Sequence, residues 1–321
     1  MMPPMRSALV TGGAGFIGSN LVDALVARGA EVAVVDDLST GRLENLEGAQ
    51  AGTATLHRID ICDSDALRAV VAGARPECIF HLAAQIDVRR SVGAPGHDAR
   101  VNVEGTVNVL DAARRSDVAR VVVSSSGGAL YGDAGVIPTP EDHRVAPDAP
   151  YGMGKWCGEA YAELYARLHG LSTVSLRYAN VYGRRQDPLG EGGVVAIFCG
   201  RALREEPAIV FGDGLQTRDF VHVDDVVAAN LKAAASAATG PINVGSGVET
   251  SVLELAALVT EAASADAGHE HRAARLGEVR RSCLDTRRAR DELVWAPAVG
   301  LRDGLRLTLD SLRDQLGPRA R

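Results

Sequence analysis

The sequence predicts an α/β protein: a doubly wound parallel sheet of the Rossmann type, followed by a smaller α/β region toward the C-terminus. Short apolar runs alternate with segments of helical spacing through the first half of the 321-residue chain, which is the pattern of strand–helix–strand units. A turn with Gly12, Gly15 and Gly18 joins the first apolar run to the first helical segment. Strands linked by helices in this order run parallel, with helices on both faces of the sheet.

The individual elements follow from length and periodicity. The predicted strands span residues 7–11, 31–36, 55–59, 78–82, 118–124 and 172–177, and the predicted helices span 16–28, 66–71, 101–114, 151–169, 224–237 and 252–263. Apolar runs such as 121–123 suit strands buried on both faces. Residues 183–193 collect Gly, Pro and Asp and predict a loop. The polar segment 265–272 is expected to be a mobile loop.

The amino-acid composition argues against several classes of function. The net charge of −7 argues against nucleic acid and anionic membranes as main partners. The five cysteines are scattered without a C-x-x-C pair: Cys62, Cys78, Cys157, Cys199 and Cys283. This argues against a disulfide framework and a metal site, and it fits a reducing cytoplasm. No apolar run is long enough for a membrane span, and no signal peptide is expected at the N-terminus.

The glycine turn predicts a dinucleotide site. Gly12, Gly15 and Gly18 follow a predicted strand and open a predicted helix with Phe16 and Ile17. A side chain at such a turn would block a pyrophosphate, whereas the helix N-terminus offers free N–H donors and a partial positive charge. Asp36 ends the next strand about 20 residues on, where a carboxylate can accept from the ribose 2′-hydroxyl. Asp36 and the adjacent Asp37 would repel a 2′-phosphate, so NAD is favoured over NADP.

A tyrosine and a lysine form the second motif. Lys155 is one of two lysines in the whole chain and follows Tyr151 by four residues, at the start of a predicted helix. This spacing puts both side chains on one helix face. An ammonium nearby favours phenolate, so Tyr151 could act as a base near neutral pH. The alternative is a pair of surface side chains without a catalytic role.

Three serines form the third motif. Ser124, Ser125 and Ser126 follow the valine-rich strand, and ligands of parallel α/β sheets bind beyond the carboxyl ends of the strands. A hydroxyl there can hydrogen-bond a substrate oxygen. The alternative is ordinary loop polarity, because Ser and Gly are common in turns.

Together these motifs make the chain resemble the extended short-chain dehydrogenase/reductase family, and within it the UDP-glucose (UDP-galactose) 4-epimerases. The resemblance covers essentially the whole chain. It rests on residues 11–18 (TGGAGFIG), 81–85 (HLAAQ), 124–132 (SSSGGALYG), 151–155 (YGMGK), 177–183 (RYANVYG), 218–225 (RDFVHVDD) and 243–247 (NVGSG).

The resemblance implies roles for further residues. Asp60 and Ile61 would frame the adenine, while Leu82, Ala83, Ala84, Gln85 and Tyr178 would line the cofactor path. The substrate side would use Asn180 at the diphosphate, Gly193, Val194, Val210 and Phe211 around a base such as uracil, and Arg218, Arg275 and Glu278 at phosphate and ribose. Arginine suits bidentate diphosphate contacts. Residues 1–176 would bind NAD, with a return of the chain around 220–247, and residues 177–321 would bind the nucleotide sugar.

The chain departs from the family pattern at Gly127. Many epimerases have Ser or Thr there, four residues before the tyrosine equivalent to Tyr131. The pair Gly127-Gly128 could form a bulge that returns a hydroxyl to the site. Ser126 is then the expected catalytic hydroxyl and Ser125 the alternative.

The resemblance also indicates which reaction of the family to expect. Related dehydratases carry an Asp-Glu pair just before that tyrosine and decarboxylases carry a Glu, whereas this chain has Gly128 and Ala129. Net reduction would need exchangeable NADPH, which Asp36 disfavours. We therefore expect NAD-dependent 4-epimerisation of a nucleotide sugar through a 4-keto intermediate, with UDP-glucose and UDP-galactose of galactose metabolism as the first candidates.

Three alternatives remain open at this point. Arg184 and Arg185 could meet the carboxylate of UDP-glucuronate. Ser282 stands where some epimerases place a bulky aromatic residue, so N-acetylhexosamines could fit. A non-catalytic NAD-binding regulator would have no reason to keep both Tyr151 and Lys155. The resemblance further implies a homodimer in which residues 101–114 and 151–169 pair across a two-fold axis.

Overall fold

The computed structural model describes residues 5–188, 193–275 and 279–316. Its main element is a seven-stranded sheet of order β10-β6-β5-β4-β1-β2-β3, in which all strand pairs are parallel. The strands are β1 (Ser7–Thr11), β2 (Glu31–Val35), β3 (Ala54–His57), β4 (Cys78–His81), β5 (Arg120–Ser126), β6 (Thr173–Tyr178) and β10 (Gly240–Val244). The predicted doubly wound α/β fold is confirmed.

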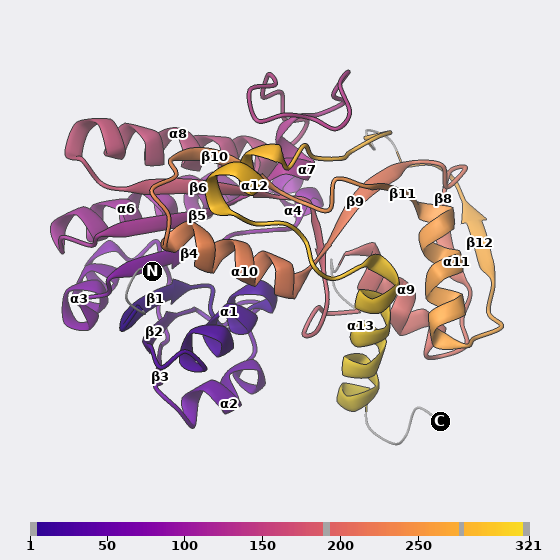
Figure 1. Ribbon diagram of the computed structural model, residues 1–321, viewed down its shortest axis with the longest axis horizontal. Helices are drawn as coiled ribbons and strands as arrows, with labels where there is room; N and C mark the ends of the chain where they lie inside the picture. Colours follow the sequence, from indigo (N-terminus) through magenta and orange to yellow (C-terminus); the bar gives the residue numbers. More distant parts are fainter. Residues whose placement is uncertain (1–4, 189–192, 276–278, 317–321) are drawn as a thin grey trace.

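Helices cover both faces of the sheet (Figure 1). One face carries α1 (Phe16–Val26), α2 (Glu47–Gln50), α10 (Val223–Ala234) and α12 (Arg287–Leu293), and the other carries α3 (Ser64–Ala74), α6 (Gly105–Arg115) and α8 (Pro150–His169). Each layer has its own apolar core, because successive strand residues point to opposite faces. Val10 and Val34, for example, belong to one core, while Leu9 and Val35 belong to the other.

The strand order fixes the place of the site. Strand β1 lies between β2 and β4, so the chain winds outward from β1 in both directions. The carboxyl ends of strands at such a switch point form the crevice in which α/β proteins bind ligands. The glycine turn after β1 and the serines that end β5 both lie at this edge of the sheet.

The C-terminal region is a smaller α/β unit at the far end of the molecule (Figure 1). Its strands are β8 (Ala208–Phe211) paired with β12 (His269–Arg272), and β11 (Glu249–Ser251), β9 (Thr217–His222) and β7 (Asn180–Tyr182) in that order. Its helices are α9 (Val194–Ala202), α11 (Val252–Ala263) and α13 (Leu301–Leu316). They enclose a separate core that includes Phe198, Leu255, Leu305 and Leu309.

Two sequence predictions are wrong in detail. Residues 265–272 are not a loop throughout, because β12 forms a parallel pair with β8. All four β12 residues are exposed, so the strand lacks the apolar alternation that would have identified it. The predicted helix 101–114 is divided into a π-helical turn, η2 (Arg100–Glu104), and α6. At the junction, a Cβ on Gly105 would lie 2.5 Å from the side chain of Ile61.

The remaining short elements have little sequence signal. They are η1 (Leu43–Leu46), α4 (Val88–Gly93), α5 (Pro95–Ala99) and α7 (Gly127–Leu130). None of the helices in the described ranges combines the length and apolar character that crossing a membrane requires.

Candidate active site

The glycine turn has the form of a phosphate cradle. Gly12 has φ +68°, and a Cβ on it would lie 2.7 Å from the backbone nitrogen of Ala83; a Cβ on Gly18 would overlap the carbonyl of Gly12. Gly15 caps α1 without a side-chain hydrogen bond, and the first turn of α1, which starts with Phe16 and Ile17, contains no acidic residue. The free N–H groups and the helix dipole therefore suit an anion such as a pyrophosphate.

The Asp36 side chain is hydrogen-bonded to this turn. Its carboxylate accepts from the backbone N–H of Ala14 and of Leu38, both at 2.9 Å, and the residue is 7% exposed. Burial raises the pKa of Asp36, and the two backbone bonds oppose that rise. Asp37 is exposed and accepts from Ser39. The carboxylate is thus fixed at the end of β2 beside the glycine turn, where the predicted ribose contact requires it.

The remaining predicted cofactor residues lie along the same edge. Leu82 and Ala83 donate from their backbone N–H groups to Thr11 Oγ1, both at 3.2 Å, which holds them against the glycine turn. Ala84 is half-buried and Gln85 is buried. Further along, Asp60 is exposed and accepts from Cys62 N–H, and Ile61 is buried.

His81 organises this edge and was missed by sequence reasoning. Its Nδ1 lies 2.8 Å from Thr11 Oγ1 and its Nε2 lies 2.9 Å from Thr106 Oγ1. Because Thr106 donates its hydroxyl proton to the Asn102 carbonyl, it accepts from His81, which fixes the Nε2–H tautomer. Burial lowers the pKa of His81 to about 3, so the ring stays neutral. The HLAAQ motif was the available signal.

Tyr151 and Ser126 meet at the carboxyl edge of β5. Tyr151 lies in the first turn of α8, which begins with Pro150 at a position that suits proline. Burial raises the pKa of Tyr151 to about 12, while a hydrogen bond with the Ser126 side chain opposes the rise. Ser126 is thus the serine of the run whose side chain acts on the Tyr151 hydroxyl.

Lys155 lies one turn further along α8. Its Nζ donates to the Ser124 carbonyl at 3.1 Å and to Ser124 Oγ at 3.4 Å. Burial lowers the pKa of Lys155 to about 8. The expected lowering of the Tyr151 pKa by this ammonium is not what the structure shows, because burial dominates at Tyr151 and Lys155 is directed at Ser124. The first serine of the run therefore positions the lysine, a role that sequence reasoning missed.

The prediction of a bulge at Gly127-Gly128 is wrong. Gly127 and Gly128 do not form a bulge but begin the short helix α7. A Cβ on Gly127 would lie 2.5 Å from the side chain of Leu284, so close packing explains the absence of a side chain there. Ser125 is buried and its hydroxyl has no hydrogen-bond partner.

One predicted substrate residue, Asn180, lies close to this edge, and two others lie on neighbouring segments of the C-terminal region. Asn180 starts β7, and its Oδ1 lies 3.7 Å from where a Cβ on Gly128 would be. Arg218 lies on β9 beside Thr217, whose carbonyl accepts from Ser282 N–H at 3.2 Å. The segment from Ser282 to Leu284 therefore runs from β9 to α7, across the space between the two parts.

The residues predicted to surround the base differ in how accessible their side chains are. Gly193 caps α9 and Val194 begins it. Val210 is fully buried in the C-terminal core, so its side chain is not available to a ligand, whereas Phe211 is half-buried. The Arg275 guanidinium stacks on the Phe211 ring, 3.8 Å from its centroid. Glu278 lies outside the described residues.

Tyr178 is placed differently from the other cofactor candidates. Its side chain is buried, and its hydroxyl donates to Asn230 Oδ1 at 3.0 Å. The hydroxyl is thus engaged by α10, and only the end of β6 that Tyr178 occupies lies near the crevice.

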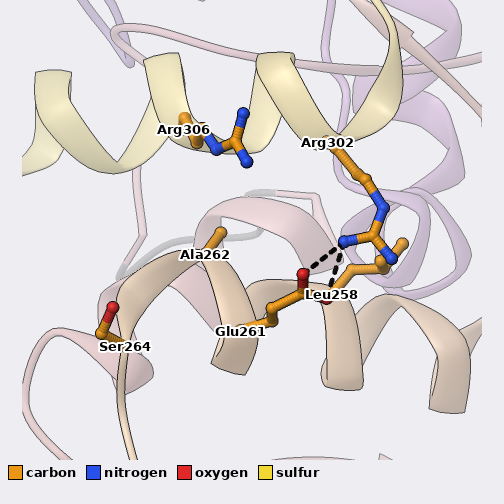
Figure 2. Close-up of a pocket in the computed structure, with 6 residues that line it drawn as sticks. All are labelled: Leu258, Glu261, Ala262, Ser264, Arg302 and Arg306. Atoms are coloured by element: carbon orange, nitrogen blue, oxygen red, sulfur yellow. Dashed lines mark hydrogen bonds and ion pairs between the residues drawn. The ribbon is translucent and has the colours of Figure 1, made fainter.

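A surface cavity of about 230 Å³ lies apart from these residues, between α11 and α13. It is lined by Leu258, Glu261, Ala262, Ser264, Arg302 and Arg306 (Figure 2). Arg302 donates to both Glu261 oxygens at 2.6 Å across it. Within the part of the chain that the structure describes, no group of His, Cys, Asp and Glu is arranged to hold a metal ion.

A Rossmann sheet with a glycine cradle, a carboxylate at the end of β2, and Ser, Tyr and Lys at its edge defines a dinucleotide-dependent enzyme of the short-chain dehydrogenase type. A family model described as NAD dependent epimerase/dehydratase family matches residues 8–245. The chain belongs to this family.

Individual relatives are similar over nearly their whole length. A UDP-glucose 4-epimerase of Mycolicibacterium smegmatis is 49% identical over 309 residues, covering 96% of this chain and 98% of the relative. The crystal structure of UDP-glucose 4-epimerase from Thermotoga maritima with UDP-glucose is 44% identical, with a TM-score of 0.94, and covers 97% of this chain and 100% of its own. The Thermus thermophilus UDP-glucose 4-epimerase complex with NAD is 40% identical, with a TM-score of 0.89 and coverages of 96% and 99%.

Proposed function

We propose that this protein is an NAD-dependent 4-epimerase that interconverts UDP-glucose and UDP-galactose, an isomerase of galactose metabolism. The observation that carries the proposal is the meeting of Ser126, Tyr151 and Lys155 at the edge of the sheet beside the glycine cradle. Helix α7, next to these residues, has the sequence Gly-Gly-Ala-Leu and carries no acid. Epimerisation needs no acid there, whereas elimination of water or loss of CO₂ would.

The mechanism assigns one task to each side chain. Tyr151, as phenolate, accepts the proton of the sugar 4-hydroxyl, and Ser126 hydrogen-bonds the same oxygen. Lys155, held by Ser124, binds the nicotinamide ribose. Bound NAD would accept the hydride from C4 and later return it. The 4-keto sugar would turn its opposite face toward the cofactor, so that the returned hydride inverts C4 while Tyr151 returns the proton to the 4-oxygen.

The cofactor assignment extends to named residues. Gly12, Gly15 and Gly18 would admit the pyrophosphate, Asp36 and Asp37 the ribose, and Asp60 and Ile61 the adenine. We assign residues 1–176, with the returning segment 220–247, to NAD binding. Residues 177–321 would bind the nucleotide sugar through Asn180, Arg218, Phe211 and Arg275.

The charge pairs of the loop after β7 argue against UDP-glucuronate as the substrate. Arg184 pairs with Asp224 at 3.2 Å and also donates to Asn20, and Arg185 pairs with Asp23 at 2.7 Å. These partners lie on α10 and α1. Both guanidiniums already have carboxylate partners, which a uronate carboxylate would have to displace.

The direct test is to incubate the purified protein separately with UDP-glucose, UDP-N-acetylglucosamine and UDP-glucuronate, and to identify the products by NMR. We expect UDP-galactose from UDP-glucose and no product from UDP-glucuronate. Absence of any product from all three, with NAD bound, would instead favour a non-catalytic regulator that kept the fold.

We also propose a homodimer. Met153, Trp156 and Tyr161 are 44%, 42% and 38% exposed along one side of α8, and an apolar stripe of this kind suits a two-fold helix interface. Light scattering at micromolar concentration should give a dimer mass, and Trp156→Glu should give a monomer. A monomeric wild-type protein would contradict the proposal.

We propose that the protein works in the cytoplasm and has no nucleic-acid partner. All five cysteines are free, which suits the reducing cytoplasm. The net charge of −7 gives no reason to expect a nucleic-acid partner.

A further inference from the structure

Asp98 lies directly beneath the helix turn that carries the reactive side chains. It belongs to α5, which packs against α8, and it is 1% exposed. A Cβ on Gly154 would lie 3.1 Å from Asp98 Oδ2. The carboxyl group therefore contacts α8 at the residue before Lys155, in the turn that also holds Tyr151.

The hydrogen bonds of Asp98 come from neutral donors. Oδ1 accepts from Gln85 Nε2 at 2.8 Å and from Asn102 Nδ2 at 3.0 Å. Both donors are side-chain amide groups, which carry no charge. A buried carboxylate is costly without a compensating positive charge. Lys155, half-buried on α8 directly after Gly154, is the cation that would supply it.

The other ionisable groups around Lys155 are already compensated or neutral. Glu159, one turn along α8, is held by Arg177 in a buried pair at 2.6 Å. His81 on β4 is neutral because burial lowers its pKa. The remaining charged groups on the neighbouring elements α4, α5 and η2 are exposed, and solvent screens them: Arg89, Arg90, His97, Arg100 and Glu104.

We propose that Asp98 is a positioning residue whose buried carboxylate sets the charge states of Lys155 and Tyr151 together. The proposal rests on the epimerase function argued above. The electrostatic effects of Asp98 agree in direction: Asp98 raises the pKa of Lys155 against the effect of burial, and it also raises the pKa of Tyr151. Both shifts have one cause, because a negative charge stabilises the protonated form of each group.

This shared cause gives the proposal a distinctive signature. Asp98→Asn removes the charge and retains much of the side-chain shape, so both groups should lose protons at lower pH. Both limbs of the pH–rate profile should then move down by about one pH unit. A merely structural role would lower activity or stability without moving both limbs in the same direction.

The chain offers a readout that needs no catalysis, because Lys155 and Lys232 are its two lysines. Lysine labelled with ¹³C at Cε should give two NMR signals, assigned with Lys232→Arg. Lys155 of the wild type should titrate near pH 8. In Asp98→Asn its titration should fall by about one unit, while exposed Lys232 stays unchanged. Glu163→Gln, which removes an exposed acid from α8, is the matched control.

The outcomes separate this inference from the proposed function. An unshifted Lys155 titration in folded Asp98→Asn overturns the role of Asp98 and leaves the epimerase untouched. Absence of epimerisation by the wild type overturns the function, whatever the NMR titration gives. If Asp98→Asn does not fold, Asp98→Ser, which is also neutral, is measured instead. An equal shift in Glu163→Gln would also overturn the proposal, because it would show a general charge effect.

Discussion

The two parts of the molecule fix their polar side chains in different ways. On the cofactor side the key groups are buried: Arg177 and Glu159 are each 4% exposed in an ion pair at 2.6 Å. In the C-terminal region the pairs lie at the surface, as in Arg302–Glu261, with 59% and 62% exposure. Buried pairs hold one geometry because breaking them is costly, whereas exposed pairs contribute little and rearrange easily.

The buried ion pair belongs to a larger hydrogen-bond network next to the candidate active site. Arg177 also donates to the Tyr131 hydroxyl at 2.7 Å, and Tyr131 donates to Asn243 Oδ1 at 2.9 Å. The network connects α8, which carries Tyr151 and Lys155, to β6 and to the edge strand β10. The side chains of the proposed mechanism therefore lie on a buried frame, whereas the C-terminal region, which we propose binds the sugar, carries exposed ion pairs that can rearrange.

The largest effect should come from breaking the buried frame. Glu159→Gln leaves the Arg177 guanidinium buried without its charge partner and should lower the free energy of unfolding by about 3–5 kcal/mol. Urea denaturation measures it. The control is Arg302→Ala at the exposed pair, for which we expect no measurable change. Equal losses in the two variants would remove the difference between the two regions.

Removal of the proposed base should act on turnover without affecting the frame. Tyr151→Phe should fold, bind NAD, and lose about 10²-fold or more in kcat, because a positioned general base contributes on this scale. The control is Tyr161→Phe on the same helix, where the side chain is exposed. Turnover close to the wild-type value in Tyr151→Phe would refute the mechanism.

Cofactor choice should depend on the single carboxylate at the end of β2. The wild type should bind NAD more tightly than NADP by at least about tenfold, because Asp36 would face the 2′-phosphate. Asp36→Ser should reduce this preference, at some cost in NAD affinity. Calorimetry with both dinucleotides is the measurement. Equal wild-type affinities would show that Asp36 is not at the ribose.

The smallest effect should come from the sugar side. Ser282 lies on the segment between β9 and α7, and we propose that its small side chain leaves room for an N-acetyl group. We expect turnover of UDP-N-acetylgalactosamine beside UDP-galactose, and Ser282→Tyr should shift the ratio of their kcat/KM values by about tenfold toward the plain hexose. An unchanged ratio would mean that Ser282 does not limit the pocket.

Local sequence patterns determined the frame of the cofactor side. Apolar runs and helical spacing identified the first six strands of the parallel sheet and the main helices, because periodicity reports which faces are buried. Gly12, Gly15 and Gly18 identified the cradle, since a turn that a ligand approaches tolerates no side chain. The spacing of Tyr151 and Lys155 put both on one helix face, because neighbours four residues apart always share it.

Only the tertiary structure decided the hydrogen-bond partners and the pKa values of these groups. Asp98 reaches the turn of Tyr151 and Lys155 from another helix more than 50 residues away, His81 bridges Thr11 and Thr106, and Ser282 pairs with Thr217. Burial raised the Tyr151 pKa where a nearby lysine was expected to lower it. Local spacing carries no information about such contacts, because burial and long-range neighbours exist only once the sheet and its helices have assembled.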